Sequence, residues 1–294
     1  MAIDLRAAFE QEPPVLDFIW PGFLAGTVGA LVAPGATGKS FWALEAAMSV
    51  ACAATVESRM AEGDLVGLAP AKAGRVVYYA GEDPEPALIG RIHSIGKHLG
   101  QGARETIIEN LMVMPIMGKL MDVMNDSKKA EIIEQCEGAR LIVMDTLSRI
   151  HTLDENSNGD MARLVARLEE IAAITKASVL YLHHVSKGST RDGQSDRQQA
   201  VRGASALVDN PRWCGFVVKM TDKEAQNHTD RVYDRQPIGE DRRKFFVRFG
   251  VSKQNYAEID DDLWYQRHEG GVLLPVKLLD VKLDGGKRRQ REQA

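Results

Sequence analysis

Short apolar runs alternate with longer stretches of mixed polarity through the middle of the chain. Apolar runs of this length, bounded by turn residues, are typical of buried strands, and they occur at residues 28–33, 75–80, 111–114, 141–144 and 177–182. The stretches between them favour helices at residues 41–54, 84–100 and 127–138. A further helix is indicated by apolar residues spaced along one helix face, namely Met161, Leu164, Val165, Leu168, Ile171 and Ala172. This alternation predicts a mostly parallel sheet covered on both faces, with ligands at the carboxyl ends of its strands.

The pattern changes after residue 182. Residues 185–202 are polar, rich in Gly, Ser and Gln, and lack a hydrophobic period, which predicts a long loop. Strand-like runs separated by turn residues then indicate an antiparallel extension, at residues 212–220, 245–251, 263–267 and 272–276. From Asp284 onward the composition is typical of a disordered tail.

Composition limits the classes of protein that fit this pattern. With 294 residues, 44% of them hydrophobic, the chain is long enough to bury one large core. A formal net charge of −4 means that any contact with nucleic acid must be local. Cys52, Cys136 and Cys214 are widely spaced, which argues against a zinc site or a disulfide scaffold and favours the reducing cytoplasm. Neither a leader peptide nor a membrane-spanning segment is indicated.

The most specific motif is APGATGKS at residues 33–40, which matches the Gly-Lys-Ser end of a P-loop. Ala33 departs from the pattern, which has glycine there, and Gly35 adds a flexible position. In a P-loop the backbone N–H groups surround phosphate, Lys39 places its charge on the β- and γ-phosphates, and Ser40 is a Mg²⁺ ligand. A glycine-rich turn without function is the alternative. The predicted ATP-binding residues of this loop are Gly35, Ala36, Thr37, Gly38, Lys39 and Ser40.

Two acidic side chains follow predicted strands and therefore lie at the edge of the sheet that carries the P-loop. Asp145 closes the apolar run LIVMD, and we interpret it as a Mg²⁺ ligand acting through bound water, although it could instead cap the next turn. Glu82 follows the strand at 75–80, and we interpret it as the general base that orients the attacking water. Asp83, which precedes a proline, is the better candidate for the cap of the following helix.

Two histidines end the predicted strand at 177–182. Paired histidines can bind metal, but no cysteine or carboxylate stands at ligand spacing from His183 and His184. A polar side chain at this edge could touch the γ-phosphate and move the loop behind it. We therefore interpret His184 as a nucleotide sensor, the alternative being an ordinary core histidine.

Several segments together resemble the RepA family, the hexameric replicative helicases of broad-host-range mobilisable plasmids within the RecA-like superfamily. The likeness runs from residue 13 to residue 271 and rests on the P-loop, GED at 81–83, LIVMD at 141–145, LHHVSKG at 182–188, RGASALVDNPRW at 202–213 and FFVRFGVSK at 245–253. It implies a RecA-like P-loop NTPase core with a C-terminal antiparallel extension. It further implies a homohexameric ring with ATP and Mg²⁺ at subunit interfaces, 5′ to 3′ translocation on single-stranded DNA, and a plasmid primase or initiator as a further partner.

The resemblance also implies roles for two arginines. Arg212 matches the arginine finger that a neighbouring subunit contributes to the transferring phosphoryl group, and its alternative is an exposed cation at the start of a strand. Arg202 in the same segment is a second candidate at the interface with ATP.

Two predicted loops would face the channel of such a ring, at residues 146–160 and 186–201. The second loop carries Lys187, Arg191 and Arg197 among small residues, which suits contact with the phosphates of single-stranded DNA. Because aromatic residues are missing from both loops, we expect sequence-tolerant binding. Asp192 and Asp196 offset part of the charge, so a solvated loop is the alternative.

The predicted organisation is an N-terminal interface segment at 1–24, an ATPase domain at 25–283 and a tail at 284–294. Residues 9–20 combine a few apolar side chains with two prolines and have little core of their own to join, so we expect them to dock on the neighbouring subunit. A filament-forming recombinase, a small-molecule kinase with residues 191–202 as its lid, and a nucleotide-binding partition or scaffold protein are the competing functions.

Overall fold

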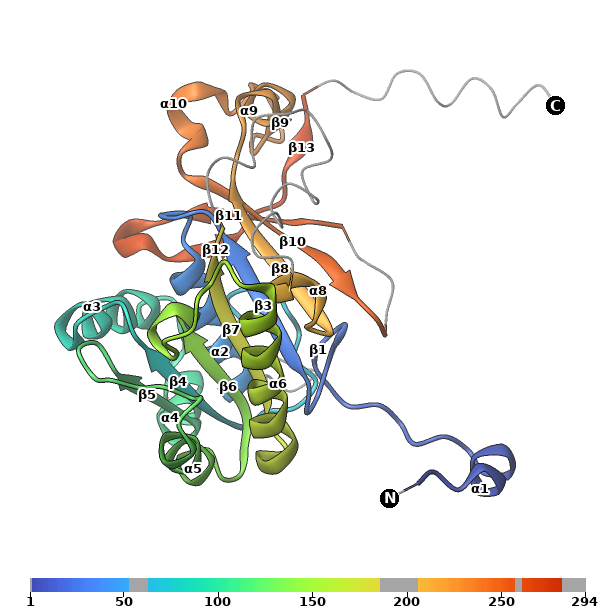
Figure 1. Ribbon diagram of the computed structural model, residues 1–294. Helices are drawn as coiled ribbons and strands as arrows, with labels where there is room; N and C mark the ends of the chain where they lie inside the picture. The colour runs from blue at the N-terminus through green and yellow to red at the C-terminus, as the bar shows by residue number, and fades with distance from the viewer. Residues whose placement is uncertain (1, 53–62, 186–205, 257–260, 282–294) are drawn as a thin grey trace.

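The computed structural model describes residues 2–52, 63–185, 206–256 and 261–281. Its centre is a nine-stranded sheet in the order β12-β11-β10-β8-β3-β7-β6-β4-β5 (Figure 1). The strands are β3 (Val28–Ala33), β4 (Arg75–Ala80), β5 (Leu111–Pro115), β6 (Ala139–Asp145), β7 (Ser178–His184), β8 (Trp213–Lys219), β10 (Phe246–Gln254), β11 (Leu263–Arg267) and β12 (Leu273–Pro275).

The direction of the strands divides the sheet into two parts. From β5 to β8 all neighbouring strands are parallel, whereas β8, β10, β11 and β12 pair antiparallel. The predicted α/β fold, with a mostly parallel sheet and a C-terminal antiparallel extension, is therefore confirmed.

Helices cover both faces of the sheet. The apolar residues of one face pack with α2 (Lys39–Cys52), α3 (Glu85–Gly96) and α4 (Gln101–Asn110). Those of the other face pack with α5 (Asp126–Gln135), α6 (Asn158–Thr175) and α8 (Ala206–Asp209). The prediction of one helix over 84–100 is wrong in extent, because α3 ends at Gly96 and a separate helix, α4, follows. The sequence carries little sign of α4, since only Ala103 and Ile107 of that helix are buried.

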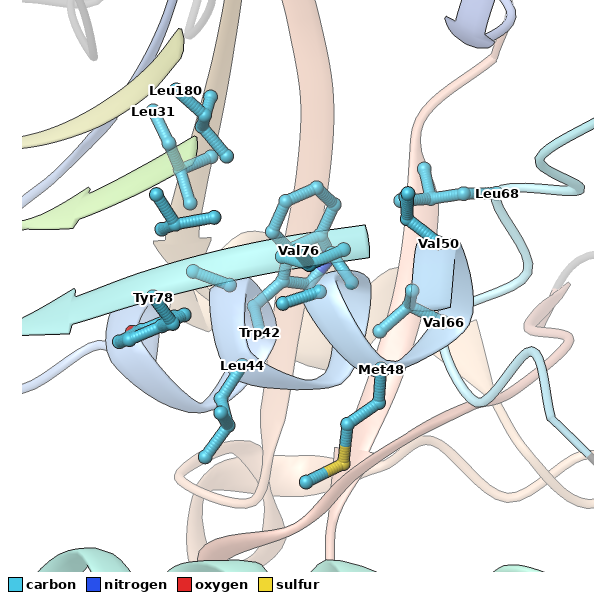
Figure 2. Close-up of a cluster of buried hydrophobic side chains, with 14 of the residues drawn as sticks. Leu31, Trp42, Leu44, Met48, Val50, Val66, Leu68, Val76, Tyr78 and Leu180 are labelled. Carbon is cyan, nitrogen blue, oxygen red and sulfur yellow. The ribbon is translucent and has the colours of Figure 1, made fainter. Parts of the chain in front are cut away.

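Successive residues of the strands point to opposite faces, as pleating requires. Val76 and Tyr78 of β4 lie in the buried cluster around α2, together with Trp42 (Figure 2). Val77 and Tyr79 lie in the cluster on the other face. The helix that follows the P-loop is thus packed directly against the strands whose ends form the site.

Smaller elements surround the sheet. Two short 3₁₀ helices, η1 (Leu147–Arg149) and η3 (Glu269–Gly271), follow β6 and β11. An outlying group of elements consists of α9 (Asp222–Asn227), β9 (His228–Thr229), α10 (Gly239–Arg243) and β13 (Leu279–Asp280). A small apolar cluster joins Ala225 of α9 to Phe246 of β10 and to Met220. Within the described ranges no helix is long and apolar enough to cross a membrane. The predicted loop at 185–202 and the tail from 284 fall outside the described residues except for Val185.

The N-terminal region joins the body through a hairpin of β1 (Phe18–Trp20) and β2 (Phe23–Leu24). Ile19 is fully buried and Trp20 is 2% exposed, and the Trp20 ring meets those of Trp42 and Trp213 edge-on. The expectation that residues 9–20 have no core of their own to join is therefore wrong for β1. The preceding helix α1 (Leu5–Glu10) has no buried residue and lies away from the sheet (Figure 1).

An ion pair fastens the hairpin to the sheet. Arg140 at the start of β6 donates to both carboxylate oxygens of Asp17, at 2.9 and 3.0 Å, and to the carbonyl oxygen of Phe18 at 2.7 Å. These hydrogen bonds favour the charged carboxylate, so the pKa of Asp17 falls to about 2. A carboxylate with a lowered pKa stabilises the fold above its unfolded pKa and loses this contribution as the pH falls through the folded value.

We predict that Arg140→Met lowers the free energy of unfolding by about 1 kcal/mol near pH 6, a value limited by the partial exposure of Asp17. The difference from the unmodified protein should shrink as the pH falls from 4 toward 2. Urea unfolding at several pH values measures both effects. Arg167→Met is the matched control, because one of its carboxylate partners, Asp126, is 82% exposed. An equal loss of unfolding free energy in both variants would contradict a stabilising role for the Arg140–Asp17 ion pair.

Candidate nucleotide-binding site

The parallel strands bring separate parts of the chain to one edge of the sheet. Ala33, the last residue of β3, is in register with His184 at the end of β7. Ala80, the last residue of β4, is in register with Asp145 at the end of β6. Because the strands are parallel, the segments that follow β3, β4, β6 and β7 all leave from this edge.

The loop between β3 and α2 has the backbone that its glycine pattern requires. Its positive φ angles lie at Ala36 (60°) and Gly38 (108°). The backbone therefore requires glycine at Gly38, whereas Gly35 has no positive φ angle. A Cβ at Gly38 would also lie 2.9 Å from the guanidinium of Arg267. The Thr37 hydroxyl donates to the Pro34 carbonyl oxygen at 2.9 Å, which closes the loop on itself.

Lys39 begins α2 and is only 3% exposed. Its Nζ donates to the hydroxyl oxygen of Thr146 at 3.4 Å, and that hydroxyl donates to the Leu182 carbonyl oxygen at 2.6 Å. Burial lowers the pKa of Lys39 to about 8, while the negative charges of Asp145 and Glu82 act in the opposite direction. The ammonium therefore stays mostly charged at neutral pH, in a place where burial favours the arrival of an anion.

Asp145 is 4% exposed, and each of its carboxylate oxygens has a partner. Oδ1 accepts a hydrogen bond from the Ser40 hydroxyl at 3.2 Å, and Oδ2 accepts one from the Tyr78 hydroxyl at 2.6 Å. Burial raises the pKa of Asp145, and the Tyr78 hydrogen bond and the Lys39 charge lower it. Ser40 and Asp145 together form an oxygen-only donor set, which fits the preference of Mg²⁺.

Glu82 and His184 meet at the mouth of the site. The His184 Nε2 lies 3.3 and 3.4 Å from the two carboxylate oxygens of Glu82, and both side chains are partly exposed. A cavity of about 280 Å³ opens between them and the P-loop. The residues that line it outside the P-loop are Phe41, Glu82, Arg91, His184 and Arg267. The sequence-predicted residues Lys39, Ser40, Glu82, Asp145 and His184 are thus brought together.

Asp83 does not cap the following helix, so that prediction is wrong. The N-cap residue of α3 is Pro84, without a side-chain hydrogen bond. Asp83 instead binds the guanidinium of Arg91 at 2.7 and 2.8 Å. This pair fixes Arg91 over the ring of Phe41, 5.1 Å from its centroid, at the wall of the cavity. The neighbouring His183 is 6% exposed, and burial lowers its pKa to about 4, so it is neutral at physiological pH.

Arg267 is a site residue that no local sequence pattern marks. It ends β11 in the antiparallel extension, and its guanidinium donates to the Thr37 carbonyl oxygen at 2.6 Å. Burial lowers the pKa of Arg267, and the Glu45 charge opposes this effect. Glu45 accepts a hydrogen bond from the Leu273 N–H, so β12 is held against α2 as well. The extension therefore contacts the P-loop through Arg267.

Arg212 lies far from the P-loop of its own chain. Its exposed side chain precedes β8, and its N–H donates to the Val28 carbonyl oxygen at 3.1 Å, at the start of β3. Five strand residues, about 16 Å, separate this point from the end of β3. The other predicted contact residues lie outside the described residues, and these are Lys187, Arg191, Arg197 and Arg202.

A P-loop between a buried strand of the parallel part of the sheet and a buried helix, with an acidic residue closing a nearby strand, defines the class. The protein has the fold and the site of a P-loop nucleotide-binding domain. A family model described as an AAA domain matches residues 2–190, more than half of the chain, and the protein belongs to this family.

A solved structure shares the fold. The ATPase domain of another protein aligns with a TM-score of 0.54 at 13% identity, over 85% of each chain. The RadB recombinase aligns with a TM-score of 0.49 at 12% identity, over 84% of this chain and 90% of the recombinase chain. The likeness to the ATPase domain concerns the fold alone.

We predict that Arg267→Ala weakens nucleotide binding about tenfold, the usual size for one lost hydrogen bond to a charged group. Both the contact that restrains the P-loop and a cation in the cavity wall are removed. The nucleotide affinity of Arg267→Lys should lie between those of Arg267→Ala and the unmodified protein, because lysine keeps the charge without the planar donor group. Titration with a fluorescent ATP analogue measures the affinities, and equal affinity in all three proteins would remove Arg267 from the site.

Proposed function

We propose that this protein is an ATP-dependent DNA helicase that assembles as a homohexameric ring, the function implied by its resemblance to the RepA family. One observation carries the proposal. The arginine that would complete the ATP site, Arg212, lies at the opposite end of β3 from the P-loop. It therefore suits a site in a neighbouring subunit and not the site of its own chain.

Each chain would supply most of the chemistry of its own site. Lys39 places its charge on the β- and γ-phosphates, and Glu82 orients the attacking water as general base. Ser40 and Asp145 would hold Mg²⁺, which neutralises charge on the phosphates when bound. His184 contacts Glu82 and is the last residue of β7, so it is suited to pass a change at the γ-phosphate to residues 186–201.

DNA would be held near the ATP site, because the loops that follow β6 and β7 leave the same edge of the sheet as the P-loop. We propose that Lys187, Arg191 and Arg197 bind the phosphates of single-stranded DNA. Arg202 is the second candidate for contact with a neighbour's ATP. A plasmid primase or initiator is proposed as a further partner.

The N-terminal arm, residues 2–16, would serve assembly. Its apolar side chains are exposed and find no core in their own chain, namely Ile3, Leu5, Phe9, Val15 and Leu16. A segment of this kind suits docking on the next subunit of a ring. We therefore propose an interface segment that is shorter than 1–24 and ends before Asp17, so that the proposed ATPase domain would begin with β1.

We predict that Glu82→Gln lowers ATP hydrolysis at least about 100-fold while nucleotide affinity stays close to that of the unmodified protein. The base is lost, but the P-loop that binds the phosphates is kept. Glu85→Gln, an exposed glutamate at the start of α3, is the matched control and should hydrolyse ATP normally. Lys39→Ala should lose hydrolysis because the charge on the phosphates is gone. Equal loss of binding and hydrolysis in Glu82→Gln would give Glu82 a structural role.

The trans role of Arg212 has a complementation test. Arg212→Ala and Lys39→Ala proteins should each be inactive, whereas rings re-formed from a mixture should recover partial ATPase activity. Only a mixed ring can place an intact Lys39 and an intact Arg212 at the same interface. Each variant disassembled and re-formed alone is the control. If verified subunit exchange leaves activity at the level of the single variants, Arg212 does not act in trans.

The function itself is tested by ATP turnover with and without single-stranded DNA, together with the mass of the assembled particle. A helicase ring should have the mass of six chains and turn over ATP faster with DNA. A filament of variable mass would favour a recombinase. Turnover that responds to a small-molecule acceptor and not to DNA would favour a kinase, and slow DNA-insensitive turnover would favour a partition or scaffold protein.

A further inference from the structure

The two oxygens of the Asp145 carboxylate have different surroundings. Oδ1 faces the Ser40 hydroxyl at 3.2 Å, beside the P-loop. Oδ2 accepts a 2.6 Å hydrogen bond from the hydroxyl of Tyr78, a residue that is 1% exposed. The shorter bond is of the charge-assisted type and is the stronger of the two. One oxygen is therefore held inside the sheet while the other stays on the side of the nucleotide.

Tyr78 is itself held in place. Its Cα is in register with Val143 on β6, two residues before Asp145. Its ring packs in the buried cluster around α2, on the face of β4 shown in Figure 2. The hydroxyl also lies 3.4 Å from the carbonyl oxygen of Ser40, so it touches both residues of the Mg²⁺ donor set.

We propose that Tyr78 is a positioning residue for Mg²⁺ binding: its hydroxyl orients the Asp145 carboxylate so that Oδ1 is presented, with Ser40, to the metal side of the site. The inference rests on the proposed function, in which Ser40 and Asp145 hold Mg²⁺. A carboxylate at a metal site is oriented by the hydrogen bonds that its other oxygen accepts, and loss of such a partner typically weakens metal affinity about 10- to 100-fold.

The chain provides a matched control in the next residue. Tyr79 is also fully buried on β4, but its side chain points to the opposite face. Its hydroxyl donates to the Gln135 side chain at 3.0 Å and lies 3.4 Å from the Cys136 sulfur, away from the nucleotide site. Tyr→Phe at either position removes one buried hydroxyl and leaves the ring in place. A difference between the two variants then reports on what the hydroxyl of Tyr78 contacts.

The experiment measures the affinity for a fluorescent, non-hydrolysable ATP analogue in excess Mg²⁺ and again in excess EDTA. The ratio of the two affinities gives the contribution of the metal without relying on turnover. We expect Tyr78→Phe to lower this ratio about tenfold or more and to leave the affinity in EDTA unchanged. Tyr79→Phe should keep the ratio of the unmodified protein. Thermal unfolding midpoints of both variants show whether either has lost its fold.

The outcomes separate this inference from the function on which it rests. If the unmodified protein binds the analogue no better in Mg²⁺ than in EDTA, the proposed Mg²⁺ site itself is wrong. If Mg²⁺ strengthens binding but Tyr78→Phe keeps the same ratio as Tyr79→Phe, the positioning role is wrong. A loss of affinity for the analogue in EDTA by Tyr78→Phe, equal to the loss in Mg²⁺, also overturns it, because the hydroxyl would then support the fold of the P-loop and not the metal.

Discussion

Lys39 and Asp145 carry opposite charges and are both buried at the edge of the sheet, and the arrangement of the site follows from the need to keep both charges there. Burial of either charge alone is costly, and it is tolerated only where hydrogen bonds replace water. Thr146 accepts from Lys39, while Ser40 and Tyr78 donate to Asp145. These partners meet because β3, β6 and β4 are parallel and end at the same edge of the sheet. Any strand slipped by one residue would turn these side chains to the wrong face.

The parts of the site that could be predicted are those that a local sequence pattern marks. The P-loop is a contiguous motif, and Glu82, Asp145 and His184 each stand at or just past the end of a readable apolar run. Parallel strands then carry such positions to a common edge, so their proximity follows without knowledge of the strand order. The same reasoning predicted the strands of the parallel core and the antiparallel extension, because strand period and turn residues are local signals.

The parts that could not be predicted depend on contacts between distant segments. Arg267 reaches Thr37 across 230 positions of the chain, and nothing local to β11 marks its last residue as a neighbour of the P-loop. Tyr78 reads as one apolar residue in a buried strand, and only its register with β6 brings it to Asp145. The sequence predicts that Trp20 belongs to a segment that docks on the neighbouring subunit, because its aromatic partner Trp213 lies in a strand that is distant in the sequence. Composition cannot distinguish such an anchor from an exposed apolar side chain.

We propose that ATP hydrolysis at this edge of the sheet drives movement along single-stranded DNA. Strand separation on duplexes that carry a single-stranded 5′ tail, a 3′ tail or no tail tests it most directly. We expect separation of the 5′-tailed duplex, dependent on hydrolysable ATP and Mg²⁺, and no separation of the 3′-tailed or blunt duplexes. Active ATP turnover without separation of any of the three duplexes would contradict it.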